Sequence, residues 1–243
     1  MSDRALSVLV YGDSKSGKTT LAMTAPEPRL LLDVEAASRF VQAKKVHWNP
    51  LDGSAPPKYD GTWDTVVVNV HSFEVALKAY EWLKAGNHDF KSVILDSITE
   101  LQVKAQEFVN GRNKMQTQHW GELLNKVAFF GRDLRDLTTN PNKPIEGVVI
   151  VATGTEKDGV HRPYLQGSVG TQVPYWYDLC GYYYVSQSVD TEGATVTDRN
   201  LLISKHPQYE AGNRVPGLPD VIQNPNISEL LDAIFGPVEE TGK

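Results

Sequence analysis

The 243-residue sequence predicts an α/β fold: a mostly parallel central sheet flanked by helices, with an antiparallel hairpin toward the C-terminal end. Three observations support this prediction. Short apolar runs recur without polar alternation, as in strands that are buried on both faces. Segments with helical spacing of apolar residues lie between these runs, and this alternation is typical of parallel sheets with right-handed crossovers. After Pro174 two longer strand-like segments follow each other directly, which favours a hairpin.

The apolar runs predict strands at residues 6–11, 30–34, 65–70, 93–95 and 148–152, followed by the two hairpin strands at 179–189 and 194–204, which residues 190–193 would connect. Helical spacing predicts helices at 18–24, 36–41, 73–84, 98–109, 121–137 and 227–235. Residues 48–61 and 155–173 show no clear periodicity, so we expect two long loops, which are often functional. The sequence has no internal repeat, and we interpret 1–243 as one domain with a core at about 5–226.

Composition indicates an ordinary globular protein. Hydrophobic residues make up 40% and charged residues 22%, and 24 Lys and Arg against 30 Asp and Glu give a formal net charge of −6. This charge argues against indiscriminate binding to nucleic acid, although a local basic loop could still bind it. Cys180 is the only cysteine, which excludes an intrachain disulfide and a Cys-rich zinc site. No segment approaches the roughly 20 apolar residues of a membrane span, so we expect a cytoplasmic protein without membrane association.

The first predicted strand runs into a glycine-rich segment that matches the phosphate-binding pattern G-x-x-x-x-G-K-[ST]. The pattern lies between a strand and a helix, as its mechanism requires, because backbone N–H groups of such a turn converge on phosphate oxygens. Lys18 would reach the β and γ phosphates of ATP. The residues expected to bind the nucleotide are Gly12, Asp13, Ser14, Lys15, Ser16, Gly17, Lys18, Thr19 and Thr20.

Two further elements complete the predicted site. Asp96 ends a buried strand, where the ligand crevice of a parallel sheet lies, so we expect it to hold Mg²⁺ through water beside the Thr19 hydroxyl. Ser97 and Glu100 form a capping box for the next helix. Asp33 and Glu35 lie on the same side of another strand end, and one of them could activate water; alternatively, Glu35 only stabilises the first turn of the following helix.

The order of these motifs resembles the RecA-type ATPase core: a Walker A motif, a strand ending Asp33-Val34-Glu35, and a strand ending Leu95-Asp96-Ser97. Within that group the chain looks most similar to short phage RecA-core proteins that act as single-strand annealing recombinases. The stretches that suggest this are residues 94–101, 118–121, 163–167 and 213–225. The resemblance implies ATP hydrolysis with Mg²⁺ and Glu35 as the base that polarises the attacking water.

The same resemblance implies partners. They are single-stranded DNA, further copies of the chain in a ring or filament with ATP at protomer interfaces, and a single-strand binding protein.

One departure from the RecA pattern concerns the strand that ends at Thr153, where RecA-type recombinases usually carry a glutamine that senses the γ-phosphate. Thr153 or Thr155 could donate that hydrogen bond instead. Annealing or ATP turnover is therefore a better expectation than full strand exchange.

By position, the DNA-facing loops of such proteins correspond to residues 110–119 and 155–173. The candidate DNA-binding residues are Arg112, Lys114, Gln116, Lys157 and Arg162. Cations beside rings suit a single-strand groove, but exposed loops of any protein carry such cations. Tyr182 and Tyr184 could form a base-stacking platform, although strand packing is the favoured interpretation.

Nothing in the core beyond Lys18 supplies a cation to the γ-phosphate. Lys205 and Arg214 are the candidates to reach it from a neighbouring protomer, unless they are ordinary surface cations.

Two other functions compete with an ATP-dependent protein that anneals DNA. A P-loop kinase for a small molecule would need an Arg-rich lid, and residues 155–173 contain only Arg162. An ATP-driven switch of the AAA+ type would need a helical lid domain, whereas the pattern indicates a hairpin and one helix.

Overall fold

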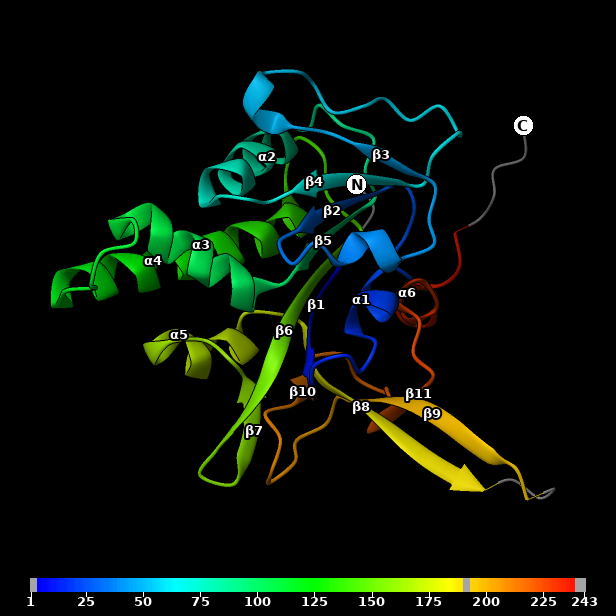
Figure 1. Cartoon of the computed structure of the whole chain (residues 1–243). Coiled ribbons are helices and arrows are strands. Elements are labelled where there is room, and N and C mark those ends of the chain that lie inside the picture. The colour runs from blue at the N-terminus through cyan, green and yellow to red at the C-terminus, as the bar shows by residue number, and fades with distance from the viewer. Residues whose placement is uncertain (1–3, 190–192, 239–243) are drawn as a thin grey trace.

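The computed structural model describes residues 4–189 and 193–238, and it has the predicted α/β architecture (Figure 1). The strands are β1 (Leu6–Gly12), β2 (Arg29–Asp33), β3 (Lys45–His47), β4 (Thr65–Asn69), β5 (Ser92–Asp96), β6 (Gly147–Lys157), β7 (Val160–Pro163), β8 (Leu179–Val189), β9 (Thr195–Leu202), β10 (Gly212–Asn213) and β11 (Val221–Gln223). The α-helices are α1 (Lys18–Ala22), α2 (Phe73–Ala85), α3 (Ile98–Asn110), α4 (Thr117–Asp136), α5 (Gly167–Gln172) and α6 (Ile227–Phe235).

The sheet brings the ends of four strands to one edge. Its order is β11-β9-β8-β1-β6-β5-β2-β4-β3, and neighbours from β8 to β3 are parallel. Gly12 is in register with Thr153, and Asp33 with Asp96. The carboxyl ends of β1, β6, β5 and β2 therefore lie together, where the ligand crevice of an open α/β sheet is found.

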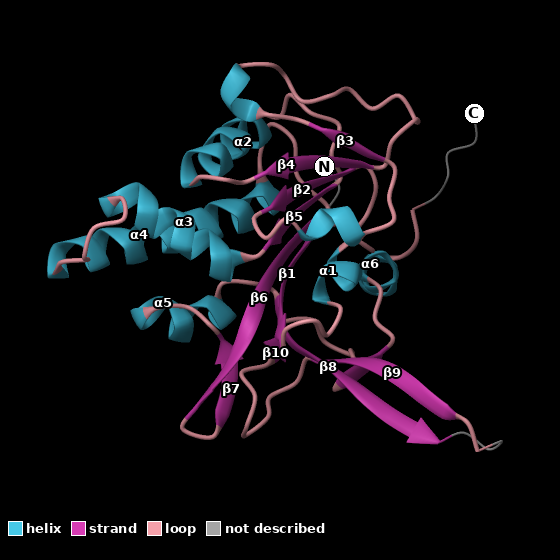
Figure 2. Ribbon diagram, viewed as in Figure 1, coloured by secondary structure: helices cyan, strands magenta, loops and turns pink. Residues whose placement is uncertain are grey.

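Helices cover both faces of the sheet. Helices α2, α3, α4 and α5 lie on one face, and α1 and α6 lie on the other (Figure 2). Along β1 the side chains alternate, so that Leu9 and Tyr11 join the core of the first face while Val8 and Val10 join the core of the second. Burial on both faces explains why this strand is apolar without alternation.

The C-terminal hairpin is confirmed. Strands β8 and β9 are antiparallel, with Tyr182 opposite Leu202 and Val189 opposite Thr195. The pair projects beyond the helical layers (Figure 1). Residues 190–192 of the predicted connection lie outside the described part of the chain. Helix α6 has the predicted bounds, because the Asn226 side chain caps its first turn by accepting from the N–H groups of Ser228 and Glu229.

Three predicted boundaries are corrected. The expected loop 155–173 contains the end of β6, then β7 and α5, because Thr155 pairs with Arg162 and Glu156 with His161 across a hairpin. Helix α4 begins at Thr117 rather than at 121, since the Gln116 N–H donates to His119 Nδ1 at 3.2 Å. The expected helix at 36–41 is a 3₁₀ helix, Ala37–Phe40.

Candidate active site

The glycine-rich segment forms the turn between β1 and α1. Gly12 lies at a close approach of two backbones, since a Cβ on this residue would stand 2.2 Å from the carbonyl oxygen of Tyr183. Lys15 and Gly17 have φ angles of +63° and +103°, in the left-handed region. Left-handed residues within a turn bring successive N–H groups to one concave side, which binds anions such as phosphate. This turn is called the P-loop below (residues 12–19).

Lys18 crosses the P-loop. Its Nζ donates hydrogen bonds to the carbonyl oxygens of Gly12 at 3.0 Å and Asp13 at 2.6 Å. Burial lowers the pKa of the Lys18 ammonium, and the negative charges of Asp96 and Glu35 oppose that shift. Those two carboxylates therefore help to keep the buried amine charged, as contact with a phosphate requires.

Thr19 and Asp96 meet as predicted. The Thr19 hydroxyl donates to Asp96 Oδ2 at 2.5 Å. Burial raises the pKa of Asp96 to about 6; the bond from Thr19 opposes the rise, and the charges of Glu35 and Asp33 add to it. A buried carboxylate beside other acids is stabilised by a cation, and Mg²⁺ commonly takes one or two carboxylates together with substrate phosphates. The hydroxyl and carboxylate present here fit that ion.

Asp33 and Glu35 have different surroundings. The buried Asp33 carboxylate accepts hydrogen bonds from the N–H groups of Ala37 at 3.0 Å and Ser38 at 3.1 Å, so it caps the 3₁₀ helix. Glu35 is exposed and accepts a hydrogen bond from the Ser97 hydroxyl. The capping function considered for Glu35 is thus performed by Asp33, and the Glu35 carboxylate faces the P-loop.

These groups share one pocket of about 190 Å³. Its lining is Ser14, Lys15, Gly17, Lys18, Thr19, Glu35, Asp96, Ser97, Val151 and Thr153. Thr153 is held there by its own N–H, which donates to Thr99 Oγ1 at 3.0 Å. We call this the phosphate pocket. It brings together a turn of the anion-binding type, a cation, a hydroxyl–carboxylate pair that fits Mg²⁺ and an exposed carboxylate, which is the set that phosphoryl transfer needs.

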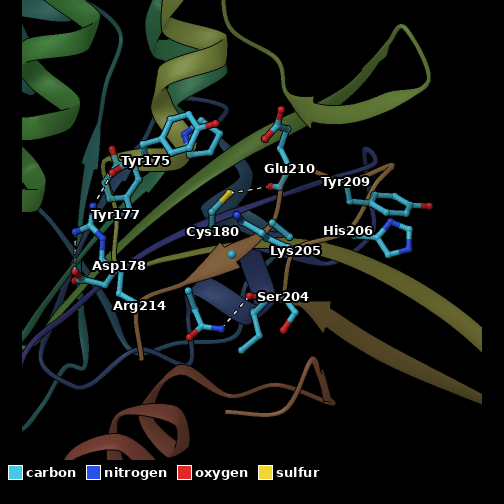
Figure 3. Close-up of a pocket in the computed structure, with 15 residues that line it drawn as sticks. Tyr175, Tyr177, Asp178, Cys180, Ser204, Lys205, His206, Tyr209, Glu210 and Arg214 are labelled. Atoms are coloured by element: carbon cyan, nitrogen blue, oxygen red, sulfur yellow. Dashed lines mark hydrogen bonds and ion pairs between the residues drawn. The ribbon is translucent and has the colours of Figure 1, made fainter. Parts of the chain in front are cut away.

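Other predicted residues lie elsewhere on the chain. Of the expected nucleotide contacts, Thr20 is exposed on α1 and does not line the phosphate pocket. Lys205 and Arg214 line a separate cavity of about 530 Å³ (Figure 3). Arg214 Nη1 lies 3.5 Å from Asp178 Oδ1, and its Nη2 donates to the carbonyl oxygen of Tyr175 at 2.7 Å. Neither cation lines the phosphate pocket with Lys18.

The predicted DNA-binding residues fall into two groups. Arg112 and Lys114 lie in the turn between α3 and α4, beside the Gln116 cap, and Arg112 is 3.8 Å from Glu107. Lys157 ends β6, and Arg162 lies in β7. Figure 1 shows the α3–α4 turn and the β6–β7 hairpin at different ends of the molecule. The two groups therefore do not share a single groove on this chain.

Sequence reasoning missed several neighbours of the P-loop. Ser97 caps α3, as predicted, by accepting from the Glu100 N–H, but its hydroxyl also donates to Glu35. The Arg199 side chain of β9 lies beside Gly17, where its Nε would be 3.4 Å from an added Cβ. Tyr182 and Tyr184 lie on one face of β8 beside residues 13–16. Because these two tyrosines are two residues apart in a strand, the sequence predicts that they share a face of it. It does not predict that the P-loop lies against that face.

Comparison with known proteins identifies the class of this site. Residues 4–215 match the model of the family described as AAA domain, which is a P-loop ATPase family. No curated protein matched the chain. The matched range includes the P-loop and the strand that ends at Asp96. It gives no evidence on the narrower resemblance to annealing recombinases. None of the helices in the described ranges is long and apolar enough to cross a membrane. With most of its length covered by this match, the chain belongs to the AAA domain family.

Proposed function

We propose that the protein binds ATP with Mg²⁺ and hydrolyses it in the phosphate pocket. The observation that carries this proposal is the position of Glu35. Its exposed carboxylate lines the same pocket as Lys18 and Thr19, although it follows a different strand. A pocket that only bound phosphate would gain nothing from an acid there, because like charges repel. A general base, in contrast, must lie close to the γ-phosphate, because it takes the proton of the attacking water.

Several residues of the pocket bind and orient the phosphates of ATP. The N–H groups of the P-loop and the Lys18 ammonium bind the β and γ phosphates. Thr19 and Asp96 would hold Mg²⁺, which neutralises phosphate charge when bound. Thr153 also lines the pocket, and its hydroxyl would donate a hydrogen bond to the γ-phosphate. These contacts orient the terminal phosphoryl group for in-line attack.

Glu35 activates the attacking water. The Ser97 hydroxyl donates to one carboxylate oxygen and leaves the second free to accept a proton. As the water oxygen bonds to the γ phosphorus, its proton passes to Glu35 and the bond from phosphorus to the β–γ bridging oxygen breaks. The leaving oxygen carries its electron pair away on ADP. Ser97 acts only through Glu35 and is a positioning residue.

The Lys18→Ala variant tests the site. We expect it to lose hydrolysis and most of its ATP affinity, because the phosphate charge loses its direct cation. The Lys78→Ala variant removes an exposed lysine on α2 and should behave as the wild type. Measurement of ATP affinity by calorimetry and of phosphate release separates binding from turnover. Wild-type turnover in Lys18→Ala would place hydrolysis elsewhere.

We also propose that the ATPase binds single-stranded DNA and promotes annealing, with a single-strand binding protein as a further partner. The support is local charge: Arg112 and Lys114 are exposed in a turn that contains no acid. Because the two candidate DNA-binding segments are apart within one protomer, a continuous groove would have to run along an assembly of protomers. This proposal therefore depends on oligomerisation.

A charge reversal tests the DNA proposal. Arg112→Glu with Lys114→Glu should weaken binding of an oligonucleotide and reduce the slope of log affinity against log salt by about one for each DNA phosphate that is no longer neutralised. Lys44→Glu with Lys58→Glu changes the net charge equally at exposed positions far from this turn in the sequence, and serves as the control. Equal effects of the two pairs would remove the turn from the interface. Stimulation of turnover by a small phosphate acceptor instead of DNA would favour a kinase, and stimulation by neither would favour a switch.

A further inference from the structure

The β8–β9 hairpin leaves one edge of β8 unpaired. Strand β8 pairs with β1 through residues 179–182 and with β9 through residues 182–189. On the side of β1, no strand in the described part of the chain pairs with β8 beyond Tyr182. The hairpin projects from the body of the protein in this region (Figure 1). We call residues 185–189 of β8 the open edge.

The backbone groups of the open edge point away from β9. In an antiparallel pair, opposite residues alternate between hydrogen-bonded pairs and pairs whose N–H and C=O groups point apart. Val185 and Arg199 are a pair of the second kind, because the Arg199 N–H donates to Asn224 Oδ1 at 3.1 Å and the Arg199 carbonyl oxygen accepts from the Asn224 N–H at 2.6 Å. By the same alternation, the N–H and C=O groups of Val185, Gln187 and Val189 all point to the side without a neighbouring strand.

The open edge lacks the protection that other edges of the described sheet have. Strands β3 and β11 are 3 residues long, and β3 begins with Lys45. Strand β7 contains Arg162 and Pro163. Short strands, positive charges and proline discourage pairing with another chain. The open edge belongs to an 11-residue strand and contains neither a charged residue nor a proline, and its Val185 and Val189 side chains are 44% and 70% exposed.

The open edge is complementary to itself. It reads the same in both directions: Val185-Ser186-Gln187-Ser188-Val189. Antiparallel pairing of two copies about Gln187 therefore places each Val185 opposite a Val189. It likewise places each Ser186 opposite a Ser188. Pairs of β-branched residues and pairs of hydroxyls stabilise a sheet, and no like charges meet. In this register the backbone groups that point outward face each other and can exchange N–H···O bonds.

We infer that the open edge pairs with the open edge of a second copy of this chain, so that two hairpins form one four-stranded antiparallel sheet about a twofold axis. Such an interface is isologous, since both copies contribute the same residues. A two-stranded hairpin alone is marginally stable at best in water, and a sheet with more strands is more stable, so each hairpin stabilises the other. The lining of the phosphate pocket includes no residue of the open edge. The inference therefore does not depend on the proposed ATP binding.

Sedimentation velocity of the full chain without nucleotide tests the inference. The wild type should be monomeric at low concentration and dimeric at high concentration, because a short strand edge gives a small interface. Gln187→Lys and Gln187→Glu should each raise the dissociation constant of the dimer by roughly fivefold or more, since like charges would lie directly opposite each other at the twofold axis. A mixture of the two variants should regain the dimer, because opposite charges then face each other.

Thr197→Lys is the matched control. Thr197 is exposed and lies opposite Gln187 on β9, so the substitution adds the same charge to the same face of the hairpin, one strand away from the open edge. It should dimerise like the wild type. Circular dichroism should show that every variant keeps its fold.

The other outcomes would overturn the inference. A wild type that stays monomeric at every concentration would leave the open edge to a strand of a different protein. An equal loss in Thr197→Lys, or a mixture without recovery, would separate dimerisation from the pairing at Gln187. Association that occurs only with ATP bound would assign the contact to the proposed ATP interface instead.

Discussion

Thr19 and Asp96 are joined by a hydrogen bond of 2.5 Å, although 77 residues separate them and β6 lies between their strands in the sheet. Thr19 lies at the end of the P-loop, which follows β1, and Asp96 is the last residue of β5. Their side chains meet beside the middle of β6, where Val151 and Thr153 complete the lining of the phosphate pocket. The hydroxyl and the carboxylate are therefore held side by side, as two oxygen ligands of one Mg²⁺ ion would have to be.

The pair predicts a pH dependence of stability. Because burial raises the pKa of Asp96 to about 6, the native protein binds more protons than the unfolded chain between about pH 4 and pH 6. The free energy of unfolding should therefore fall as pH rises through that window. The ionised carboxylate costs about 3 kcal/mol at neutral pH by this linkage. Asp96→Asn should remove the cost and gain stability over the wild type mainly above pH 6.

Urea denaturation of both proteins from pH 4 to pH 8, with a chelator present, measures this difference directly. Ionisable groups that do not interact with Asp96 titrate alike in both proteins and cancel in the comparison. A stability difference that stays constant across the range would show that Asp96 has an ordinary pKa.

Gly12→Ala should damage the P-loop itself. The new Cβ would meet the Tyr183 carbonyl oxygen at 2.2 Å, so β8 and β1 must move apart. Forcing extra volume into a packed site costs typically about 1–3 kcal/mol, and we expect a lower melting temperature together with weaker ATP binding. Gly121→Ala in α4 is the matched control, since nothing beyond its chain neighbours and the backbone of its own helix lies within 4 Å of the new Cβ. It should raise stability by about 1 kcal/mol, because alanine is the better helix former. Equal melting temperatures for the two variants would contradict the close approach.

A mixing experiment tests the oligomer with ATP at its interfaces. If Lys205 or Arg214 reaches the γ-phosphate of a neighbour, Arg214→Ala or Lys205→Ala should lose turnover by roughly a thousandfold, and specific activity should rise with protein concentration. Mixing an inactive Arg214→Ala protein with Lys18→Ala should restore activity, because about a quarter of the interfaces then combine an intact P-loop with an intact cation. Mixtures that stay inactive would mean that each chain completes its own site, or that Arg214 serves only its contact with Asp178.

Much of the phosphate pocket could be predicted from the sequence because its chemistry is concentrated in short stretches. The pattern from Gly12 to Thr19 fixes a strand, a turn and a helix together, and Asp96 follows from its place at the end of a buried strand. The strand pattern alone left the choice between Asp33 and Glu35 open, since both lie on one side of the strand, and only the resemblance to RecA-type ATPases favoured Glu35. The roles of the two acids depend on the path of the chain after residue 35, because this path places the N–H groups of Ala37 and Ser38 within hydrogen-bond distance of Asp33.

The β6–β7 hairpin carries a local signal that hydrophobic periodicity does not reveal. Asp158 and Gly159 connect the two strands, both with left-handed φ angles, and an Asp-Gly pair is a strong hairpin signal. The ring cluster of His161, Tyr182 and Tyr209 is the opposite case. Its members come together from distant segments, and no local pattern encodes that meeting. Local chemistry was predictable, and long-range packing was not.

The Glu35→Gln variant gives the most direct test of ATP hydrolysis in the phosphate pocket. Glutamine keeps the shape of the side chain and can still accept the bond from Ser97, but it cannot take a proton from water. We predict that ATP and Mg²⁺ bind with nearly wild-type affinity while the single-turnover rate of hydrolysis falls roughly a hundredfold or more. Glu74→Gln, an exposed acid on α2, should hydrolyse ATP at the wild-type rate. Normal hydrolysis by Glu35→Gln would contradict the assignment of Glu35 as the base, and loss of ATP binding would show that this carboxylate holds the site together instead.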